Sequence, residues 1–536
     1  MTAILKDFYN NVIRKKTYWV PLLFFTWASY GFSMMNRTIS IDDLITPYYV
    51  DGQVWLSEYR WGAVLWKKLF SFGDCTPYID KFLSIHLLMA AATLAGCVIY
   101  YLNGRKKNTW LYTIPACLMV TYPLINEIWE YTCGATIVVP GDFLLVGTAV
   151  LYQLTRPKRT WKSLLAASLI LTQVVCSAES QACVYVTSVM LIIFYKYCVL
   201  WEKGTGRLPW LTEGLWMAGP LAAAVVLRSL TGRLLLAVLG LKRTFRGATD
   251  IAWPLSMREL AQLLRQMTDL YIARALVYFP IGIFLASVLV FAVIVITLTV
   301  RKKNGLVLFL GIFTGVSLFT LMLIQGAPLP YRTAVNFTPF IGFTCYLLLD
   351  WCFSLKKQTL ARIAIVLMLW FCWRQAAYLH KVLALNNQRS DNEAAAMQQI
   401  GYRLVSEYPG RKVLLFGDYY AGDIIHDQIT ARDDTWNGHL YYKIREHVLP
   451  GKTGRDQRFL DTNVCDTMDF YHEQFEAKLM KAFFSYYGYE IDYWDEISEE
   501  ERTEIWKKAR AHGMNAFEIW DAGECVVVVT ADLHEE

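Results

Sequence analysis

Three short stretches place acids and arginines directly beside apolar runs of the chain. Asp42 and Asp43 lie in a polar segment after the first apolar run, and Arg60 and Trp61 follow shortly afterwards. Arg332 comes much later, after a proline-rich turn. A carboxylate near a low-dielectric boundary can remove the proton of an attacking hydroxyl group. An arginine offers a planar, permanently charged group that can stabilise a departing phosphate.

The two adjacent acids cannot act side by side. Neighbouring side chains face opposite sides of a strand and diverge by about 100° in a helix. We therefore expect one of Asp42 and Asp43 to reach the reacting centre, while the other holds a helix end, an arginine or a metal. The alternative is that one of them only caps an interfacial helix over residues 44–55, and spacing alone does not separate the two interpretations.

Further acids and an amide stand at the ends of later apolar runs. Glu127 and Glu130 flank a tryptophan, and Glu179 and Gln181 begin another run. Such side chains can hydrogen-bond sugar hydroxyls, but they can equally cap helices or pair between them. The aromatic face of Trp61 could stack on a sugar, although an aromatic belt at the bilayer interface would place it there as well.

Apolar runs long enough to cross a bilayer recur up to about Leu379. The whole chain of 536 residues is 55% hydrophobic and only 18% charged, whereas soluble proteins carry about a quarter charged residues. The composition therefore predicts an α-helical polytopic membrane protein with about eleven transmembrane helices. The expected spans are 18–36, 81–101, 109–125, 136–154, 161–177, 181–200, 213–231, 272–299, 305–325, 333–353 and 360–379.

Basic residues cluster in short turns that all fall on one side of these spans. The positive-inside rule assigns that side, and with it the N-terminus, to the cytoplasm. Asp42 and Asp43 then lie outside, in a first external loop over residues 37–80, and an odd number of spans puts the C-terminal region outside too. The basic groups are Lys6 with Arg14–Lys16, Arg105–Lys107, Arg156 with Lys158 and Arg159, Lys203 with Arg207, Arg301–Lys303, and Lys356 with Lys357.

One predicted external stretch is also basic. Long loops escape the charge bias, so the topology is retained. The stretch is either a surface helix against anionic lipid headgroups or a cradle for a lipid phosphate. Its basic residues are Arg233, Lys242, Arg243, Arg246, Arg258 and Arg265.

The chain becomes charged after Leu379, which predicts a soluble extracytoplasmic α/β domain over residues 380–536 after a transmembrane domain over residues 1–379. Two short apolar segments, 412–416 and 525–530, are typical of buried strands. Helical spacing is found over residues 393–407, 470–486 and 499–512.

Several classes of protein are excluded. The chain has no Walker loop, GxGxxG after a strand, HExxH or GxSxG, and its basic residues form no nucleic-acid-binding face. The twelve cysteines lack zinc-site spacing. Four of them, Cys75, Cys133, Cys465 and Cys525, fall on the predicted external side, where disulfides and free thiols are both compatible with the sequence.

The acids and arginines introduced above carry a resemblance to a known family. At Ile41–Asp43, Tyr59–Trp61 and Pro330–Arg332 the sequence resembles the bacterial Gtr-type glucosyltransferase family II, which includes membrane enzymes that convert O-antigen serotypes. The family pattern has an acidic pair in the first external loop, then a Gly-Arg-Trp-like motif, and a late Pro-x-Arg loop. The resemblance runs from the first helix to about Asp418, and Tyr59 replaces the usual glycine.

The resemblance implies a GT-C architecture and an inverting hexosyltransferase. The donor would be a polyprenyl-phosphate-linked sugar, expected to be glucose, and the acceptor a cell-surface glycan outside the bacterial cytoplasmic membrane. By position, Asp42 and Asp43 are the catalytic candidates, and Arg60 and Arg332 are the donor-phosphate candidates. The other substrate-binding candidates are Trp61, Glu127, Glu130, Glu179, Gln181 and Tyr331. Arginines could suffice for a monophosphate, but a divalent cation, Mg²⁺ or Mn²⁺, stays open.

Two other functions are compatible with many helices and external arginines. A polysaccharide polymerase or ligase would join lipid-linked oligosaccharides instead of adding single sugars. A transporter or flippase would place ionisable residues at the membrane midplane and often has duplicated halves. Here the acids flank the spans and no internal repeat is present, which favours an enzyme.

Overall fold

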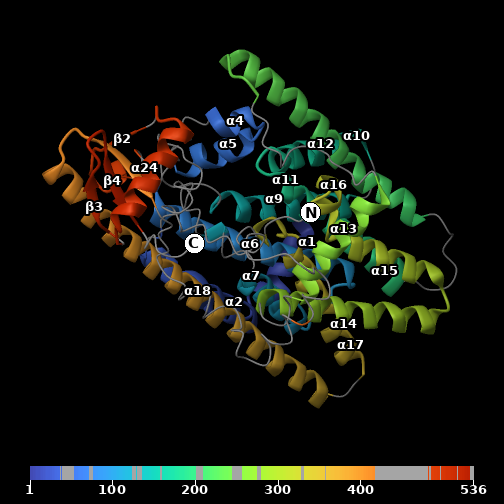
Figure 1. The fold of residues 1–536 in the computed structure, drawn as a ribbon. Helices are drawn as coiled ribbons and strands as arrows, with labels where there is room; N and C mark the ends of the chain where they lie inside the picture. Colours follow the sequence, from blue (N-terminus) through green and yellow to red (C-terminus); the bar gives the residue numbers. More distant parts are fainter. Residues whose placement is uncertain are drawn as a thin grey trace.

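The structure is a computed structural model in which most residues are helical (Figure 1). It describes residues 1–36, 38, 53–71, 76–123, 128–129, 136–156, 160–200, 209–243, 256–273, 279–327, 331–355, 358–416, 443, 481, 484–494, 496–515 and 517–530.

Where the structure describes them, the predicted apolar runs are mostly helical. Seven of the described helices, α6, α9, α11 with η3, α12, α14, α17 and α18, are long and apolar enough to cross a membrane. This agrees with a polytopic membrane protein, while the total of eleven spans stays a prediction. The helices are α2 (Lys16–Met35), α6 (Pro77–Leu102), α7 (Trp110–Thr121), α9 (Val138–Thr155), α10 (Trp161–Val175), α11 (Glu179–Phe194), η3 (Tyr195–Val199), α12 (Pro209–Leu239), α14 (Phe279–Lys302), α15 (Gly305–Ser317), α16 (Thr320–Gln325), α17 (Phe337–Ser354) and α18 (Gln358–Glu407).

Shorter helices connect or precede these elements. They are α1 (Thr2–Phe8), η1 (Tyr9–Ile13), α4 (Gln53–Ser57), α5 (Trp61–Phe70), α13 (Met257–Thr268), η5 (Asp269–Ala273) and η7 (Tyr331–Thr333). The basic stretch predicted to lie on the membrane surface contains α13, which begins with a capping box between Ser256 and Glu259. Leu263 is buried while Arg258 and Arg265 are exposed. This amphipathic pattern suits a surface helix, and its contact with lipid stays a prediction.

The bundle core lies among α6, α7, α9, α11 and α17. Small residues allow close approach there: a Cβ at Gly342 of α17 would lie 2.7 Å from Met119 of α7. Aromatic packing joins neighbouring helices, as in the stacked rings of Phe284 and Phe337, whose centroids are 3.9 Å apart. In contrast, only a small share of the residues of α12 and α14 is buried, as expected for helices that face lipid.

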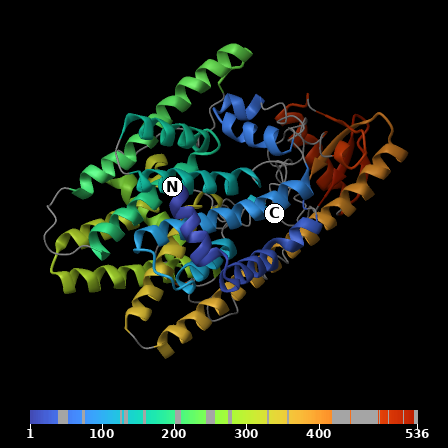
Figure 2. The same ribbon diagram turned by 180° about the vertical axis from the view of Figure 1, so that it is seen from behind.

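The helix α18 is 50 residues long and continues well beyond the bundle. The sequence predicted a span ending at 379 and a separate helix over 393–407, but the structure has one helix through both. No glycine or proline occurs between Gln358 and Ile400, so nothing interrupts its hydrogen bonding. Figures 1 and 2 show α18 along one side of the bundle, with the sheet at its C-terminal end. The division at 379/380 therefore falls inside this helix, and the domain boundary stays a prediction.

A four-stranded sheet packs against the end of α18. Its order is β2-β1-β4-β3, with β1 (Lys412–Phe416) parallel to β2 (Asp492–Tyr493) and β4 (Val526–Val529), and β3 (Ile519–Asp521) antiparallel to β4. Alternate side chains of β1 and β4 pack against α18 on one face and α24 (Glu499–His512) on the other. The two predicted strands and the helix over 499–512 are thus present, whereas most of the helix predicted over 470–486 lies outside the described residues.

Candidate active site

The turn between α4 and α5 carries the sequence Tyr59-Arg60-Trp61-Gly62. Tyr59 has a φ of 63°, in the left-handed region that favours glycine. This backbone shape accounts for the glycine that the family pattern usually has at this position. The chain keeps the turn with a tyrosine, whose side chain is buried.

Gly62 fixes the start of α5 to the end of α10. Its N–H donates a hydrogen bond of 2.9 Å to the carbonyl of Cys176, and Gln173 Nε2 donates one of 2.8 Å to the carbonyl of Gly62. A Cβ at position 62 would lie 2.5 Å from the carbonyl oxygen of Gln173. Only glycine therefore permits this approach.

Two aromatic side chains of the turn contact α12. The Trp61 Nε1–H donates a 3.0 Å hydrogen bond to Thr231 Oγ1. The Tyr59 ring lies against Gly232, and the Arg243 guanidinium carbon lies 4.7 Å from the centroid of that ring. The turn is thus held by both α10 and α12.

Four alternating charges meet beside this turn, and we call Glu58, Arg60, Glu179 and Arg228 the charged cluster. Arg60 pairs with Glu58 at 3.0 Å and with Glu179 at 3.3 Å. Arg228, from α12, pairs with Glu179 and also donates a 3.3 Å hydrogen bond to the carbonyl of Glu58. A single carboxylate, Glu179 at the start of α11, therefore holds two guanidinium groups together.

The charged cluster is partly accessible. The exposed fractions of the side chains are 26% for Arg60, 21% for Glu179 and 16% for Arg228, but only 2% for Glu58. The Nε–H groups of both arginines have no hydrogen-bond acceptor among the described residues. Unsatisfied charged donors are costly, so an additional anion with acceptor oxygens would suit this arrangement.

Buried polar contacts hold α5, the helix that follows the turn. Lys67 of α5 forms a 2.7 Å ion pair with Asp80 in the first turn of α6, and Ser71 also donates to Asp80. Asp142 of α9 accepts hydrogen bonds from Trp66 Nε1 at 2.9 Å and from Ser177 at 3.2 Å. These contacts position α5 on α6 and α9.

The structure brings some of the predicted site residues together. Arg60 and Glu179 form an ion pair, and Trp61 anchors the same turn. Gln181 is buried one half-turn after Glu179 and forms no hydrogen bond through its side chain in the described part of the chain. Arg332 lies in η7, just before α17. Asp42, Asp43, Glu127, Glu130 and the side chain of Tyr331 lie outside the described residues.

Glu58 and Arg228 were missed by the sequence reasoning. Arg228 stands inside the apolar run over 213–231, where a charged side chain is costly and points to a partner or a function. That cost is a signal that could have identified it. Glu58 lies two residues before Arg60, directly before the Tyr59–Trp61 motif, but its burial shows only in the fold.

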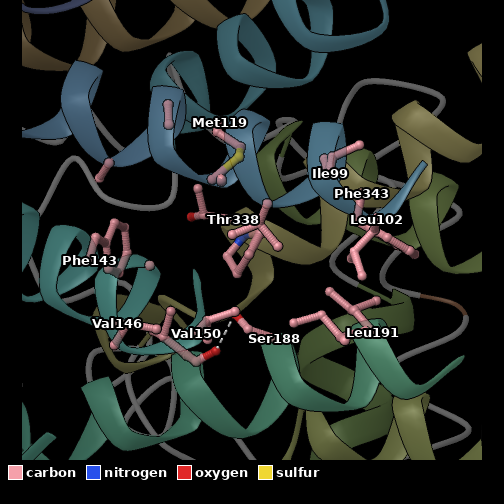
Figure 3. Close-up of a pocket in the computed structure, with 18 of the residues that line it drawn as sticks. Ile99, Leu102, Met119, Phe143, Val146, Val150, Ser188, Leu191, Thr338 and Phe343 are labelled. Atoms are coloured by element: carbon pink, nitrogen blue, oxygen red, sulfur yellow. Dashed lines mark hydrogen bonds between the residues drawn. The ribbon is translucent and has the colours of Figure 1, made fainter. Parts of the chain in front are cut away.

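A cavity of about 90 Å³ lies elsewhere, within the helical core (Figure 3). Its lining is almost entirely apolar and includes Met119, Phe143 and Leu191. Its hydroxyls belong to Ser188, which donates to the carbonyl of Val184 at 2.7 Å, and Thr338. With no charged lining residue, this cavity does not suit a phosphate.

Metal binding was left open by the sequence. Within the described ranges, no three His, Cys, Asp or Glu side chains gather in a way that could hold a metal ion. Asp42 and Asp43 lie outside that search.

A family comparison covers the turn and the charged cluster. The sequence profile described as Glucosyl transferase GtrII matches residues 31–349, more than half of the chain. No curated protein and no solved structure matches the chain. The matched region includes the acidic pair, the arginine motif, Glu179 and Arg228. The chain therefore belongs to the GtrII glucosyl transferase family.

Proposed function

We propose that this glucosyltransferase moves glucose from a polyprenyl-phosphate donor to a cell-surface glycan on the outer face of the bacterial cytoplasmic membrane. Arg60 and Arg228 bind the donor phosphate, and Asp42 or Asp43 acts as general base. The proposal includes a GT-C architecture and inversion at the anomeric carbon.

The observation that carries the proposal is the meeting of two arginines at Glu179. Two guanidinium groups repel each other unless anions lie between them. Glu179 and Glu58 hold the pair in place, and the partial exposure of Arg60 and Arg228 leaves one side accessible. A phosphate that enters there meets two permanently charged donors that are already positioned.

The chemistry follows from the leaving group. The acceptor hydroxyl loses its proton to an aspartate as its oxygen attacks the anomeric carbon, and the bond from that carbon to the phosphate oxygen breaks. The phosphate leaves with the bonding electrons and gains negative charge, which Arg60 and Arg228 stabilise. Because phosphate is a weak base, this step needs no general acid.

The outer-face location is supported by the basic turns. With the eleven predicted spans, the short basic turns would all fall on the side opposite to the segment with Asp42 and Asp43. In the same predicted topology the charged cluster would share that side, because Glu179 begins α11 and Asp80 begins α6. The prenyl chain of the donor would lie among the neighbouring bilayer lipids, with its phosphate at the membrane surface.

The test measures the release of polyprenyl phosphate by the full chain in lipid nanodiscs that contain polyprenyl-phosphate-glucose and are supplied with surface glycan as the acceptor. We expect Arg60→Gln and Arg228→Gln each to lower the rate at least a hundredfold, because each removes transition-state charge stabilisation of about 3 kcal/mol. Arg156→Gln is the matched control. Arg156 is an exposed arginine that follows the C-terminal end of α9, whereas the N-terminal part of α9 contacts α5. Asp42→Asn and Asp43→Asn test the base.

Several results would contradict the proposal. Unchanged release by folded Arg60→Gln and Arg228→Gln would remove their role, and full activity in both aspartate variants would remove the base. Joined oligosaccharides without release of monophosphate would indicate a polymerase or ligase. Donor movement that needs an ion gradient and yields no covalent product would indicate a transporter.

A further inference from the structure

The apolar cavity in the helical core is formed by α6, α7, α9, α11 and α17 (Figure 3). Small residues make room for it, because Ala92 and Ala95 of α6 and Gly147 of α9 stand on its walls, where larger side chains would fill the space. Its volume is about 90 Å³, compared with about 150 Å³ for an engineered apolar cavity that binds benzene. It therefore has room for one small branched hydrocarbon group.

Water is a poor occupant of this cavity. A stable buried water molecule needs at least two polar partners. Among the described lining residues only Ser188 and Thr338 carry hydroxyls, and Ser188 already donates to the carbonyl of Val184. Thr338 is fully buried, and its Oγ1 has no hydrogen-bond partner among the described residues. One available hydroxyl does not hold a water molecule, whereas hydrocarbon would restore the dispersion contacts that the apolar walls lack.

The cavity wall is not completely closed. Ala95, Gly147 and Ser188 keep accessible surface and are half-buried, as is Pro339 at the start of α17. The neighbouring wall residue Ala92 is almost fully buried. The cavity therefore presents free surface to an incoming chain.

The helix α11 connects the charged cluster to the cavity. Glu179, which pairs with Arg60 and Arg228, begins this helix. Val184 lines the cavity five residues later, about 7.5 Å along the helix axis. Further lining residues of α11 follow as far as Ile192. A phosphate held by the two arginines would thus lie one to two helical turns from the near end of the cavity, measured along α11.

The helix α9 makes a second connection. Its Asp142 accepts the hydrogen bond from Trp66 of α5, and the next residue, Phe143, lines the cavity. Since α5 begins at the arginine motif, the same short helix that carries this motif packs at the near end of the cavity. Two independent elements therefore place the apolar cavity next to the proposed phosphate site.

We propose that the cavity receives a branched unit of the donor's polyprenyl chain close to the phosphate. This inference rests on the proposed function, in which the charged cluster holds that phosphate. A polyprenyl chain is apolar and carries a methyl branch on every unit, so it needs a wider space than a straight acyl chain. Ala92, Ala95 and Gly147 supply that width, and the cavity therefore favours an isoprenoid over a straight chain.

The test compares a donor that has the chain with one that lacks it. The full chain in nanodiscs receives surface glycan and either polyprenyl-phosphate-glucose or methyl-phosphate-glucose, and glucosylated glycan is measured. The ratio of kcat/KM for the two donors reports what the chain contributes. We expect Ala92→Leu and Ala95→Leu, which fill the cavity, each to lower this ratio at least tenfold, because the burial of one branched unit is lost.

Matched variants keep the two proposals distinct. Ala90→Leu adds the same side chain on the exposed face of α6, away from the cavity, and should leave the ratio unchanged. Arg60→Gln should lower kcat/KM for both donors, since both carry the phosphate. An unchanged ratio in Ala92→Leu and Ala95→Leu would overturn this inference and leave the role of the charged cluster intact.

Photolabelling tests the same contact without turnover. A polyprenyl phosphate with a diazirine near its phosphate should label the peptide that contains residues 184–192 of α11. Labelling should fall at least tenfold in Ala92→Leu and stay unchanged in Ala90→Leu. Equal labelling by a straight-chain alkyl phosphate with the same diazirine would indicate a cavity for bilayer acyl chains and overturn the assignment to an isoprenoid. Labelling of this peptide without any glucose transfer by the wild-type chain would overturn the proposed function and keep the chain site.

Discussion

The ring of Tyr59 fills the space that a side chain at Gly232 would need. A Cβ built on Gly232 would lie closer than 3.0 Å to the Tyr59 ring. Tyr59 itself holds a left-handed φ. The turn of the arginine motif and the surface of α12 are therefore complementary, and each residue constrains the other.

This complementarity predicts strong coupling between the two positions. Gly232→Ala should destabilise the protein by about 1–3 kcal/mol because the added methyl meets the ring. The same change in a Tyr59→Gly background should be nearly neutral, since the ring is gone and the left-handed strain is relieved. Thermal midpoints of the purified wild type, both single variants and the double variant measure the coupling. Additive effects would show that the contact is absent.

Gly62 should not tolerate even one extra carbon. In Gly62→Ala the methyl group would meet the carbonyl of Gln173, which belongs to the backbone of α10 and cannot turn away. We expect a lower thermal midpoint and loss of glucosyl transfer, because the shift displaces Arg60. Gly315→Ala is the matched control: it lies within α15, and a Cβ there would have no neighbour within 4 Å. Equal behaviour of the two variants would contradict the packing of α5 on α10.

The buried ion pair between Lys67 and Asp80 predicts a pattern of single and double substitutions. The exposed fractions of the two side chains are 6% and 0%. Removal of one partner leaves an uncompensated buried charge, so Lys67→Met or Asp80→Leu alone should cost about 3–5 kcal/mol. The double variant should recover much of that loss. Guanidine or thermal unfolding in detergent tests this, and a double variant as unstable as the sum of the singles would refute it.

Cys525 should behave as an inert thiol in the folded protein. It is buried beside β4, and burial raises the pKa of its thiol to about 11. Because the folded pKa is above the unfolded value of about 8.5, its contribution to stability is complete at neutral pH. That contribution is lost as the pH rises from about 8.5 towards and past 11.

Maleimide labelling, read by mass spectrometry of the peptide that contains Cys525, tests this. At pH 7.5 the native chain should label slowly and the denatured chain quickly. A cysteine introduced by Ser406→Cys, at an exposed position of α18, should label quickly in both. Rapid labelling of native Cys525 would show that the sheet is open.

The sequence predicted the helices well because crossing a bilayer demands long apolar runs, and such runs are visible without a fold. It failed at α18 for a related reason. The helix continues past residue 379 after its apolar character ends, and only the lack of glycine and proline indicates that continuation. The two strands 412–416 and 525–530 were visible because they are buried on both faces and hence apolar throughout.

The site was only partly predictable. Arg60 belongs to a recognisable motif, but its partner Glu179 is 119 residues away, and distance along the chain gives no indication of pairing. Arg228 was concealed by the apolar run that surrounds it. Tyr59 marked a departure from the family pattern, but its left-handed backbone and its contact with Gly232 depend on α12, which the local sequence does not show.

A helix of 50 residues is roughly 75 Å long. The helix α18 therefore connects the helical bundle to the β-sheet as one continuous element. The N-terminal part of α18 is apolar enough to cross a bilayer, and the β-sheet packs on its C-terminal part. If α18 changes its tilt in a thicker or thinner membrane, the sheet at its C-terminal end moves with it. We therefore expect membrane thickness to affect the position of the sheet relative to the bilayer.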